Sequence, residues 1–191
     1  MLWHKQLGHS SQVRLKKLFT KDLVIGLPKT KFKEDKVCEA CTLGKQIKSS
    51  FKSKQMISST CSLELIHMDL CGPMRVQSRG GKRYVFVLVD DYTRYTWTLF
   101  LAAKDDAFKV FCSLMRKIQR KYGKQLKAIR SDHGTEFENS KFAQYCDYHG
   151  VDHNFSAPRT PQQNGVVERK NKTLQEMAKT MMIASKIANQ F

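Results

Sequence analysis

LELIHMDLCGPMRVQSRGGKRYVFVLVDDYTRYTWTLFL, residues 63–101, sets the architecture of this chain. Three parts of it, 63–70, 84–89 and 96–101, are rich in aliphatic, β-branched and aromatic residues, as strands are. Asp90 to Arg94 supplies the polar residues of a turn between the second and third parts. The segment therefore predicts a three-stranded antiparallel meander.

The residues that follow alternate between helix and strand patterns. Apolar side chains recur every three or four positions from about Asp105 to Tyr122, and Gly123 stands where a glycine ends a helix. A strand is predicted over 126–131, a short helix over 140–149 and a fifth strand over 151–155. Alternation of this kind favours the α/β class.

A long helix is predicted at the end of the chain. Thr160 is placed to be its N-cap, Pro161 its first residue and Gln163 the third residue of a capping box. The whole order predicts a mixed five-stranded sheet with helices packed on it.

The charge of the chain points to a polyanionic partner. The net charge is +17, of which +9 belongs to residues 1–60. Nucleic acid is the commonest such partner, although a basic protein without one is the alternative. The Ser- and Lys-rich stretch Gly44–Thr60 is interpreted as a linker, which predicts a small domain over 1–60 and a larger one over 61–191. No apolar run is long enough to predict a membrane span.

Three carboxylates are predicted to meet at one edge of the sheet. Asp69 ends the first strand and Asp132 the fourth, and parallel neighbouring strands would bring both to the same edge. Glu168, two turns into the last helix, can reach that edge. Carboxylate oxygens select Mg²⁺ or Mn²⁺, and two such ions would support phosphodiester chemistry.

A second group has the spacing of zinc ligands. His4 and His9 are followed after 28 residues by Cys38 and Cys41. Two imidazoles and two thiolates suit a closed, structural Zn²⁺ site, and a domain this small would depend on it. Residues five apart lie about 140° apart around a helix, so Gly8 is expected to turn the chain between the histidines. The other four cysteines are interpreted as small buried or neutral residues.

These motifs resemble the integrases of copia-type LTR retrotransposons over nearly the whole chain. The resemblance rests on the first-aspartate strand, the hairpin after it, the second-aspartate loop, the glutamate motif and the zinc motifs: His67–Leu70 with Gly72–Met74, Val89–Arg94, Ser131–Phe137, Ser156–Gly165 with Glu168–Arg169, and Leu2–His4, Leu7–His9, Cys38–Cys41 with Gly44–Lys45.

The resemblance implies a ribonuclease-H-like catalytic core after a pre-integrase zinc domain, in a fragment of a Pol polyprotein that is C-terminally truncated. It implies metal-dependent DNA strand transfer, with Asp69, Asp132 and Glu168 as metal ligands. It also implies DNA ends and target DNA as partners and a homo-oligomer. The expected place of action is the nucleus after a cytoplasmic particle stage, although no clear targeting signal is present.

The polar side of the last helix is a hypothetical DNA contact. Its members fall roughly on the side of Glu168, and a solvated polar face is the competing interpretation: Asn164, Asn171, Lys172, Gln175 and Lys179. Two other functions stay open at this point. One is a catalytically inert, zinc-stabilised nucleic-acid-binding fragment, and the other is a ribonuclease-H-like nuclease that only hydrolyses.

Overall fold

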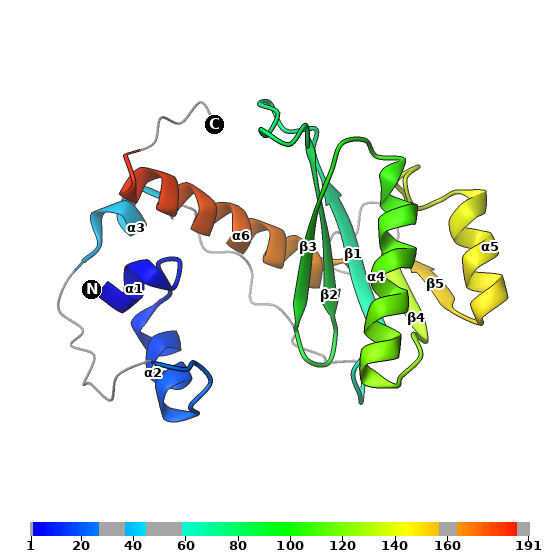
Figure 1. Cartoon of the computed structure of the whole chain (residues 1–191), viewed down its shortest axis with the longest axis horizontal. Coiled ribbons are helices and arrows are strands. Elements are labelled where there is room, and N and C mark those ends of the chain that lie inside the picture. The colour runs from blue at the N-terminus through cyan, green and yellow to red at the C-terminus, as the bar shows by residue number, and fades with distance from the viewer. Residues whose placement is uncertain (1, 27–36, 45–58, 157–163, 187–191) are drawn as a thin grey trace. The chain divides into compact units, whose positions relative to one another are not determined.

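The computed structural model describes residues 2–26, 37–44, 59–156 and 164–186 (Figure 1). It divides into two compact units. The first comprises Met1–Phe51 with Lys172–Phe191, and the second comprises Lys52–Asn171. Most of the predicted linker, 45–58, and the predicted capping box, 160–163, lie outside the described residues.

The second unit is built on a five-stranded sheet in the order β3-β2-β1-β4-β5. Its strands are β1 (Leu65–Cys71), β2 (Tyr84–Asp90), β3 (Thr96–Leu101), β4 (Ala128–Ser131) and β5 (Asp152–Phe155). The first three form the antiparallel meander that the sequence predicts, while β4 pairs in parallel with both β1 and β5. The mixed sheet is thereby confirmed, including the parallel pairing of the strands that carry or precede Asp69 and Asp132.

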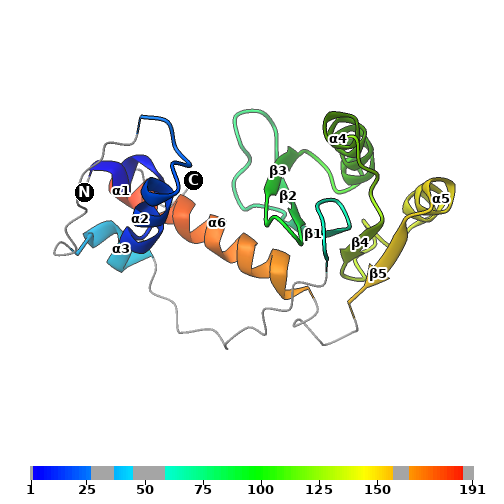
Figure 2. The same cartoon turned by 90° about the horizontal axis from the view of Figure 1, so that it is seen from below.

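Two helices cover one face of this sheet, α4 (Asp106–Tyr122) and α5 (Ser140–His149) (Figures 1 and 2). Phe111 of α4 and Phe142 of α5 are fully buried, with ring centroids 5.3 Å apart. Each helix ends at a glycine in the left-handed conformation, which a side chain would strain. The Asn139 side chain accepts hydrogen bonds from Lys141 N and Phe142 N, and so caps α5.

The last helix, α6, spans Gly165–Ala184. Asn164 precedes it and is not helical, and the predicted start at Pro161 lies outside the described residues. The Asn164 side-chain amide donates a hydrogen bond to the carbonyl of Met68 on β1 at 3.3 Å. This long-range contact holds the residue before the helix against β1. A local capping pattern in the sequence gives no information about such a contact. Within the described residues, no helix is long and apolar enough to cross a membrane.

The first unit contains α1 (Leu2–Gln6), α2 (Gln12–Thr20) and α3 (Glu39–Gly44), together with α6 from Lys172 onward. The helices pack closely, because a Cβ on Gly44 would lie 2.5 Å from Thr180 Oγ1 and 3.0 Å from Thr180 Cα. A Cβ on Gly8 would lie 2.8 Å from the methyl carbon of Met177. The second half of α6 therefore supplies part of the packing surface for the small helices.

Replacing Gly44 by alanine should destabilise this unit, although the same change usually stabilises a helix. Its Cβ would meet the backbone of Thr180, and overpacking of this kind costs roughly 1–3 kcal/mol. In an open helical site, alanine would gain about 1 kcal/mol. Denaturant unfolding of the zinc-loaded chain measures the sign directly, and a gain in stability would contradict the Gly44–Thr180 contact.

Candidate functional site

Asp69 lies near the carboxyl end of β1 and is partly buried. Its Oδ2 accepts a hydrogen bond from the side-chain amide of Asn171 on α6. Burial raises the pKa of Asp69, and the neighbouring carboxylate of Asp132 raises it further, against the hydrogen bond from Asn171. The sequence places this acid at the end of a strand, while Asn171 fixes the direction of its side chain.

Asp132 directly follows β4, beside the end of β1. Its Oδ1 accepts a hydrogen bond from Gly134 N at 3.2 Å, and its carbonyl accepts one from Ser131 Oγ at 2.9 Å. The ring of His153 contacts the same serine hydroxyl at 2.9 Å. Buried Ser131 thus anchors the turn from which the exposed Asp132 carboxylate projects.

Glu168 lies in the first turn of α6. Burial raises its pKa, the carboxylates of Asp69 and Asp132 raise it further, and Arg169 opposes the shift. The three acids come from three separate elements, and their meeting at one metal site stays a prediction. Three anions in this arrangement repel unless a cation neutralises them, and their hard oxygen donors fit Mg²⁺ or Mn²⁺. Asn171, by its bond to Asp69, is a supporting residue of this group.

The five polar residues expected to touch DNA fall into two groups. Asn164 and Asn171 are 3% and 6% exposed, and both amides are committed to β1 through Met68 and Asp69. They are positioning residues in this structure, because the packing of α6 on β1 covers them. Lys172, Gln175 and Lys179 are exposed, and DNA contact stays a prediction for these three.

A buried network of hydrogen bonds holds the first half of β1 to the turn after β2. Asp91 is 1% exposed and accepts hydrogen bonds from His67 Nε2 at 3.0 Å, Arg94 Nη1 at 2.9 Å and the Ser59 hydroxyl at 2.7 Å. Burial lowers the pKa of His67, against the hydrogen bond to Asp91, and the ring donates to that carboxylate through Nε2–H. The sequence predicts Asp91 only as a turn residue, whereas the structure gives it this buried role. Its position directly after five buried strand residues, 86–90, was the available signal.

Replacing Asp91 by alanine should destabilise the second unit by about 3–5 kcal/mol, because it leaves buried donors without an acceptor. Chemical denaturation measures this. Glu138→Ala is the matched control, since it removes the exposed pair between Glu138 and His133 and should cost less than about 1 kcal/mol. Equal losses in the two variants would contradict the role given to Asp91.

The same network predicts a pH dependence. Burial alone would raise the pKa of Asp91, but the hydrogen bonds from Ser59 and His67 and the Arg94 charge hold it well below its ordinary value. A depressed folded pKa gives stability that is fully present above the unfolded value, about 4, and is lost as the pH falls further. The free energy of unfolding of the wild type should therefore fall more steeply below pH 4 than that of Asp91→Asn.

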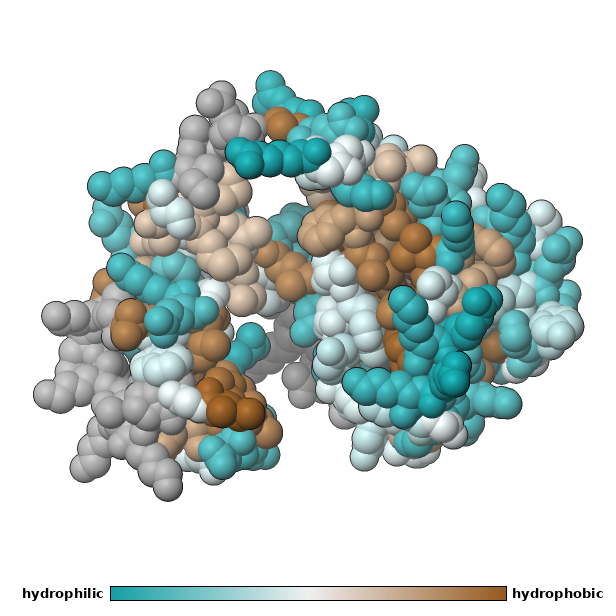
Figure 3. Space-filling model, viewed as in Figure 1, coloured by the Kyte–Doolittle hydropathy of each residue, from teal (hydrophilic) through white to brown (hydrophobic). Residues whose placement is uncertain are grey.

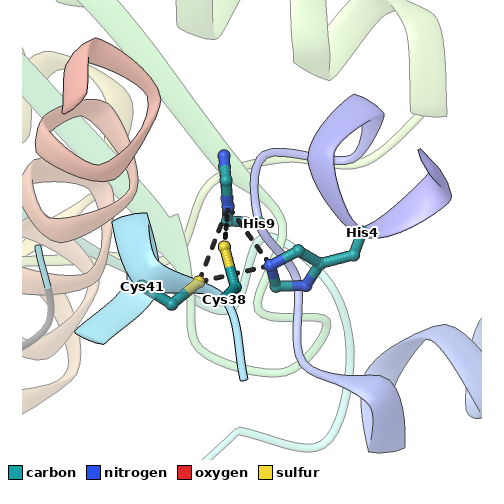
Figure 4. A group of neighbouring side chains, drawn as sticks. All are labelled: His4, His9, Cys38 and Cys41. Carbon is teal, nitrogen blue, oxygen red and sulfur yellow. Dashed lines mark hydrogen bonds between the residues drawn. The ribbon is translucent and has the colours of Figure 1, made fainter. Parts of the chain in front are cut away.

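The four predicted zinc ligands form one cluster in the first unit (Figure 4). Within the described ranges it is the one group of three or more His, Cys, Asp or Glu side chains whose ligand atoms all lie within 4.8 Å of one another. His4 lies in α1 and His9 lies beyond it, after a turn in which Gly8 and His9 both adopt positive φ. The expected turn between the two histidines is confirmed.

Four of the six distances between the donor atoms are close to those of a zinc tetrahedron. Zn–S bonds near 2.3 Å and Zn–N bonds near 2.0–2.1 Å would place two nitrogens about 3.3 Å apart and a nitrogen and sulfur about 3.6 Å apart. His4 Nε2 and His9 Nδ1 are 3.2 Å apart. Cys38 Sγ lies 3.4 Å from His9 Nδ1, and Cys41 Sγ lies 3.3 and 3.6 Å from the two nitrogens.

One ligand is oriented by a further hydrogen bond. His4 Nδ1 lies 2.8 Å from the carbonyl of Ser10 and donates to it, which leaves Nε2 unprotonated and pointing into the cluster. His4 and His9 are both buried. The site has four protein ligands, so it fits a structural zinc.

Two known protein families match this chain. Residues 59–161 match the integrase core domain, and residues 1–46 match the GAG-pre-integrase domain. The first match contains Asp69 and Asp132 but stops before Glu168, whose role stays a prediction supported by the bond from Asn171, on the same helix, to Asp69.

The chain is also similar to parts of much longer curated proteins. It is 37% identical over 190 residues to the retrovirus-related Pol polyprotein from transposon TNT 1-94 of Nicotiana tabacum, covering 100% of this chain and 14% of that protein. It is 33% identical over 184 residues to the corresponding polyprotein from transposon RE2 of Arabidopsis thaliana, covering 94% and 12%. The chain therefore spans about one seventh or less of the length of these relatives.

Among solved structures, a chain of a simian T-cell lymphotropic virus intasome in complex with PP2A regulatory subunit B56 gamma is similar at a TM-score of 0.48 and 15% identity. The similarity covers 62% of this chain and 47% of that chain.

Proposed function

Because this chain belongs to the integrase core domain family and carries a GAG-pre-integrase domain before that core, we propose that it is the zinc-binding and catalytic part of a retrotransposon integrase. The reaction proposed is metal-dependent transfer of a DNA 3′ end to target DNA. The observation that supports the proposal is that α6, which carries Glu168, is bonded to Asp69 through Asn171, while Asp132 follows the strand that pairs with the strand of Asp69.

The proposed roles follow from where each acid stands. Asp69, Asp132 and Glu168 would hold two Mg²⁺ or Mn²⁺ ions, which supply activation of the attacking oxygen and stabilisation of the leaving oxygen when bound. Asn171 holds one oxygen of Asp69 in a fixed direction. The exposed carboxylates of Asp132 and Glu168 leave the site open to a DNA strand.

Further features of the proposal concern assembly and place of action. DNA ends and target DNA are the proposed partners, with Lys172, Gln175 and Lys179 as phosphate or base contacts. We propose a homo-oligomer acting on two DNA ends, with a cytoplasmic particle stage before action in the nucleus. The His4, His9, Cys38 and Cys41 site is proposed to hold zinc as a structural ion.

A strand-transfer assay tests the function. The chain is incubated with Mn²⁺ or Mg²⁺, a labelled duplex end and a target plasmid, and joined products are separated by size. Joining that requires the added metal is the expected result. Hydrolysis of the duplex without joining would favour the nuclease, and DNA binding without either reaction would favour the inert binding fragment.

A further inference from the structure

The segment that links β1 to β2, residues 72–83, is densely basic. It contains Arg75, Arg79, Lys82 and Arg83 and no acidic residue. Four charges in 12 residues compare with +17 over 191 for the whole chain, so the density is nearly four times the average. We refer to residues 72–83 as the basic hairpin.

The four charged side chains are available to a ligand. All four residues are exposed. Among the described residues, none of them has a side-chain ion pair or hydrogen bond to another protein group. Figure 3 shows hydrophilic residues over this segment, which projects beyond the end of the sheet in Figure 1. A group of like charges without acidic partners raises the local potential for an anion.

The backbone that carries these charges is ordered by its own hydrogen bonds. Met74 N donates to the carbonyl of Arg83 at 2.7 Å, and Ser78 N donates to the carbonyl of Lys82 at 2.9 Å. At the tip, the Gln77 amide donates to the carbonyl of Gly81, and Lys82 N donates to the Ser78 hydroxyl. A rigid support lowers the ordering entropy that binding would otherwise cost.

The base of the hairpin is fixed closely to the sheet. A Cβ on Gly72 would lie 2.7 Å from the Tyr84 ring and 2.8 Å from the carbonyl of Arg83. Gly72 also has a φ of +140°, which side-chain-bearing residues rarely adopt. The basic hairpin is therefore a continuation of the two strands and is held to the one that carries Asp69.

We propose that the basic hairpin binds the phosphate backbone of duplex DNA a short distance from the bond that reacts at Asp69. This inference rests on the proposed function. From Asp69 to Ser78 an extended chain spans at most about 30 Å. DNA rises about 3.4 Å per base pair, so the contacted phosphates lie within about nine base pairs of the reacting one. Arginine, three of the four residues, pairs with phosphate through two N–H groups at once.

The test compares two variants of the full zinc-loaded chain that lack four positive charges each. The hairpin variant carries Arg75→Gln, Arg79→Gln, Lys82→Gln and Arg83→Gln. The control carries Lys109→Gln, Arg116→Gln, Lys117→Gln and Arg120→Gln, all exposed positions on α4. Affinity for a fluorescent 30-base-pair duplex is measured by anisotropy over a range of salt concentrations, without a catalytic metal.

The salt dependence distinguishes direct phosphate binding from general attraction. A plot of log affinity against log salt has a negative slope. Each phosphate that the protein no longer neutralises makes this slope less steep by about 0.9. We expect the magnitude of the slope to be smaller by about 2–4 units in the hairpin variant. We also expect its affinity to be at least tenfold lower near 0.1 M salt. In the control the magnitude of the slope should decrease by less than about one unit, because charges beyond the Debye length of about 10 Å are screened.

Several results would overturn the inference. Equal slopes in the hairpin variant and the wild type would overturn it, even if the wild type joins DNA and the proposed function stands. If the slope and the affinity decreased equally in the hairpin variant and the control, the effect would come from net charge and not from the hairpin. A larger reduction for an RNA duplex than for DNA would reject DNA as the ligand. A wild-type chain that binds no duplex would overturn both the inference and the proposed function.

A smaller variant keeps the test valid if the fourfold change disturbs folding. Arg79→Gln with Lys82→Gln removes only the two charges nearest the tip, and the Lys82 backbone bonds remain. Thermal unfolding and zinc content should match the wild type. The expected fall in slope is about half that of the fourfold variant, and an unchanged slope in a folded double variant would also overturn the inference.

Discussion

Replacing Glu168 by glutamine should reduce metal-dependent joining of a labelled DNA end by about a thousandfold or more, with no loss of folding. The exchange keeps the size of the side chain and removes its charge. Residues that act as one unit in catalysis lose most of the rate when any one is removed, and Asp69, Asp132 and Glu168 are proposed to act as such a unit. The strand-transfer assay measures the rate with Mn²⁺ and with Mg²⁺.

Glu176→Gln is the matched control, because it makes the same chemical change eight residues further along α6. It should keep the wild-type rate. DNA affinity measured without metal should be unchanged or slightly higher in Glu168→Gln, since one anion is removed. Joining that persists in Glu168→Gln at the rate of the control would remove Glu168 from the site and leave the assignment of Asp69 and Asp132 standing.

Removing zinc should unfold the small helices of the first unit while the sheet of the second unit stays folded. Among the described residues, this unit has few fully buried apolar side chains, of which Leu15 is one. Structural zinc sites contribute roughly 10–16 kcal/mol of apparent binding free energy at neutral pH, which is more than a core of this size supplies. Hydrogen exchange read by mass spectrometry should show reduced protection in α1, α2 and α3 after chelation.

Cys41→Ser should reproduce this unfolding without a chelator and should lower the bound zinc from one ion per chain to nearly none. Cys112→Ser, which changes a thiol of the second unit, is the control and should leave both readings unchanged. Retained protection of α1–α3 after complete zinc removal would mean that the helices and the second half of α6 hold the unit by packing alone.

The helices and strands of this protein follow mainly from local properties, and the sequence determined most of them. Runs of aliphatic, β-branched and aromatic residues predicted the strands, and glycine marked where α4 and α5 end. The placing of Asp69 and Asp132 at one edge depended on a parallel pairing of the first and fourth strands, which the structure shows between β1 and β4. The spacing of the histidines and cysteines predicted a zinc site, and the four donor atoms lie within 4.8 Å of one another in the structure.

Only the tertiary structure decided which polar side chains are shielded from water. Asn164 and Asn171 share a helix surface pattern with exposed Lys172, yet both are buried because β1 lies against them. Asp91 follows the rules of a turn residue in the sequence, but Ser59 and His67 from distant segments enclose it. Apolar residues that recur every 3.6 residues in a helix, or every 2 in a strand, show which side of that element is apolar. Whether one polar side chain is buried depends instead on which other segment of the chain packs against it.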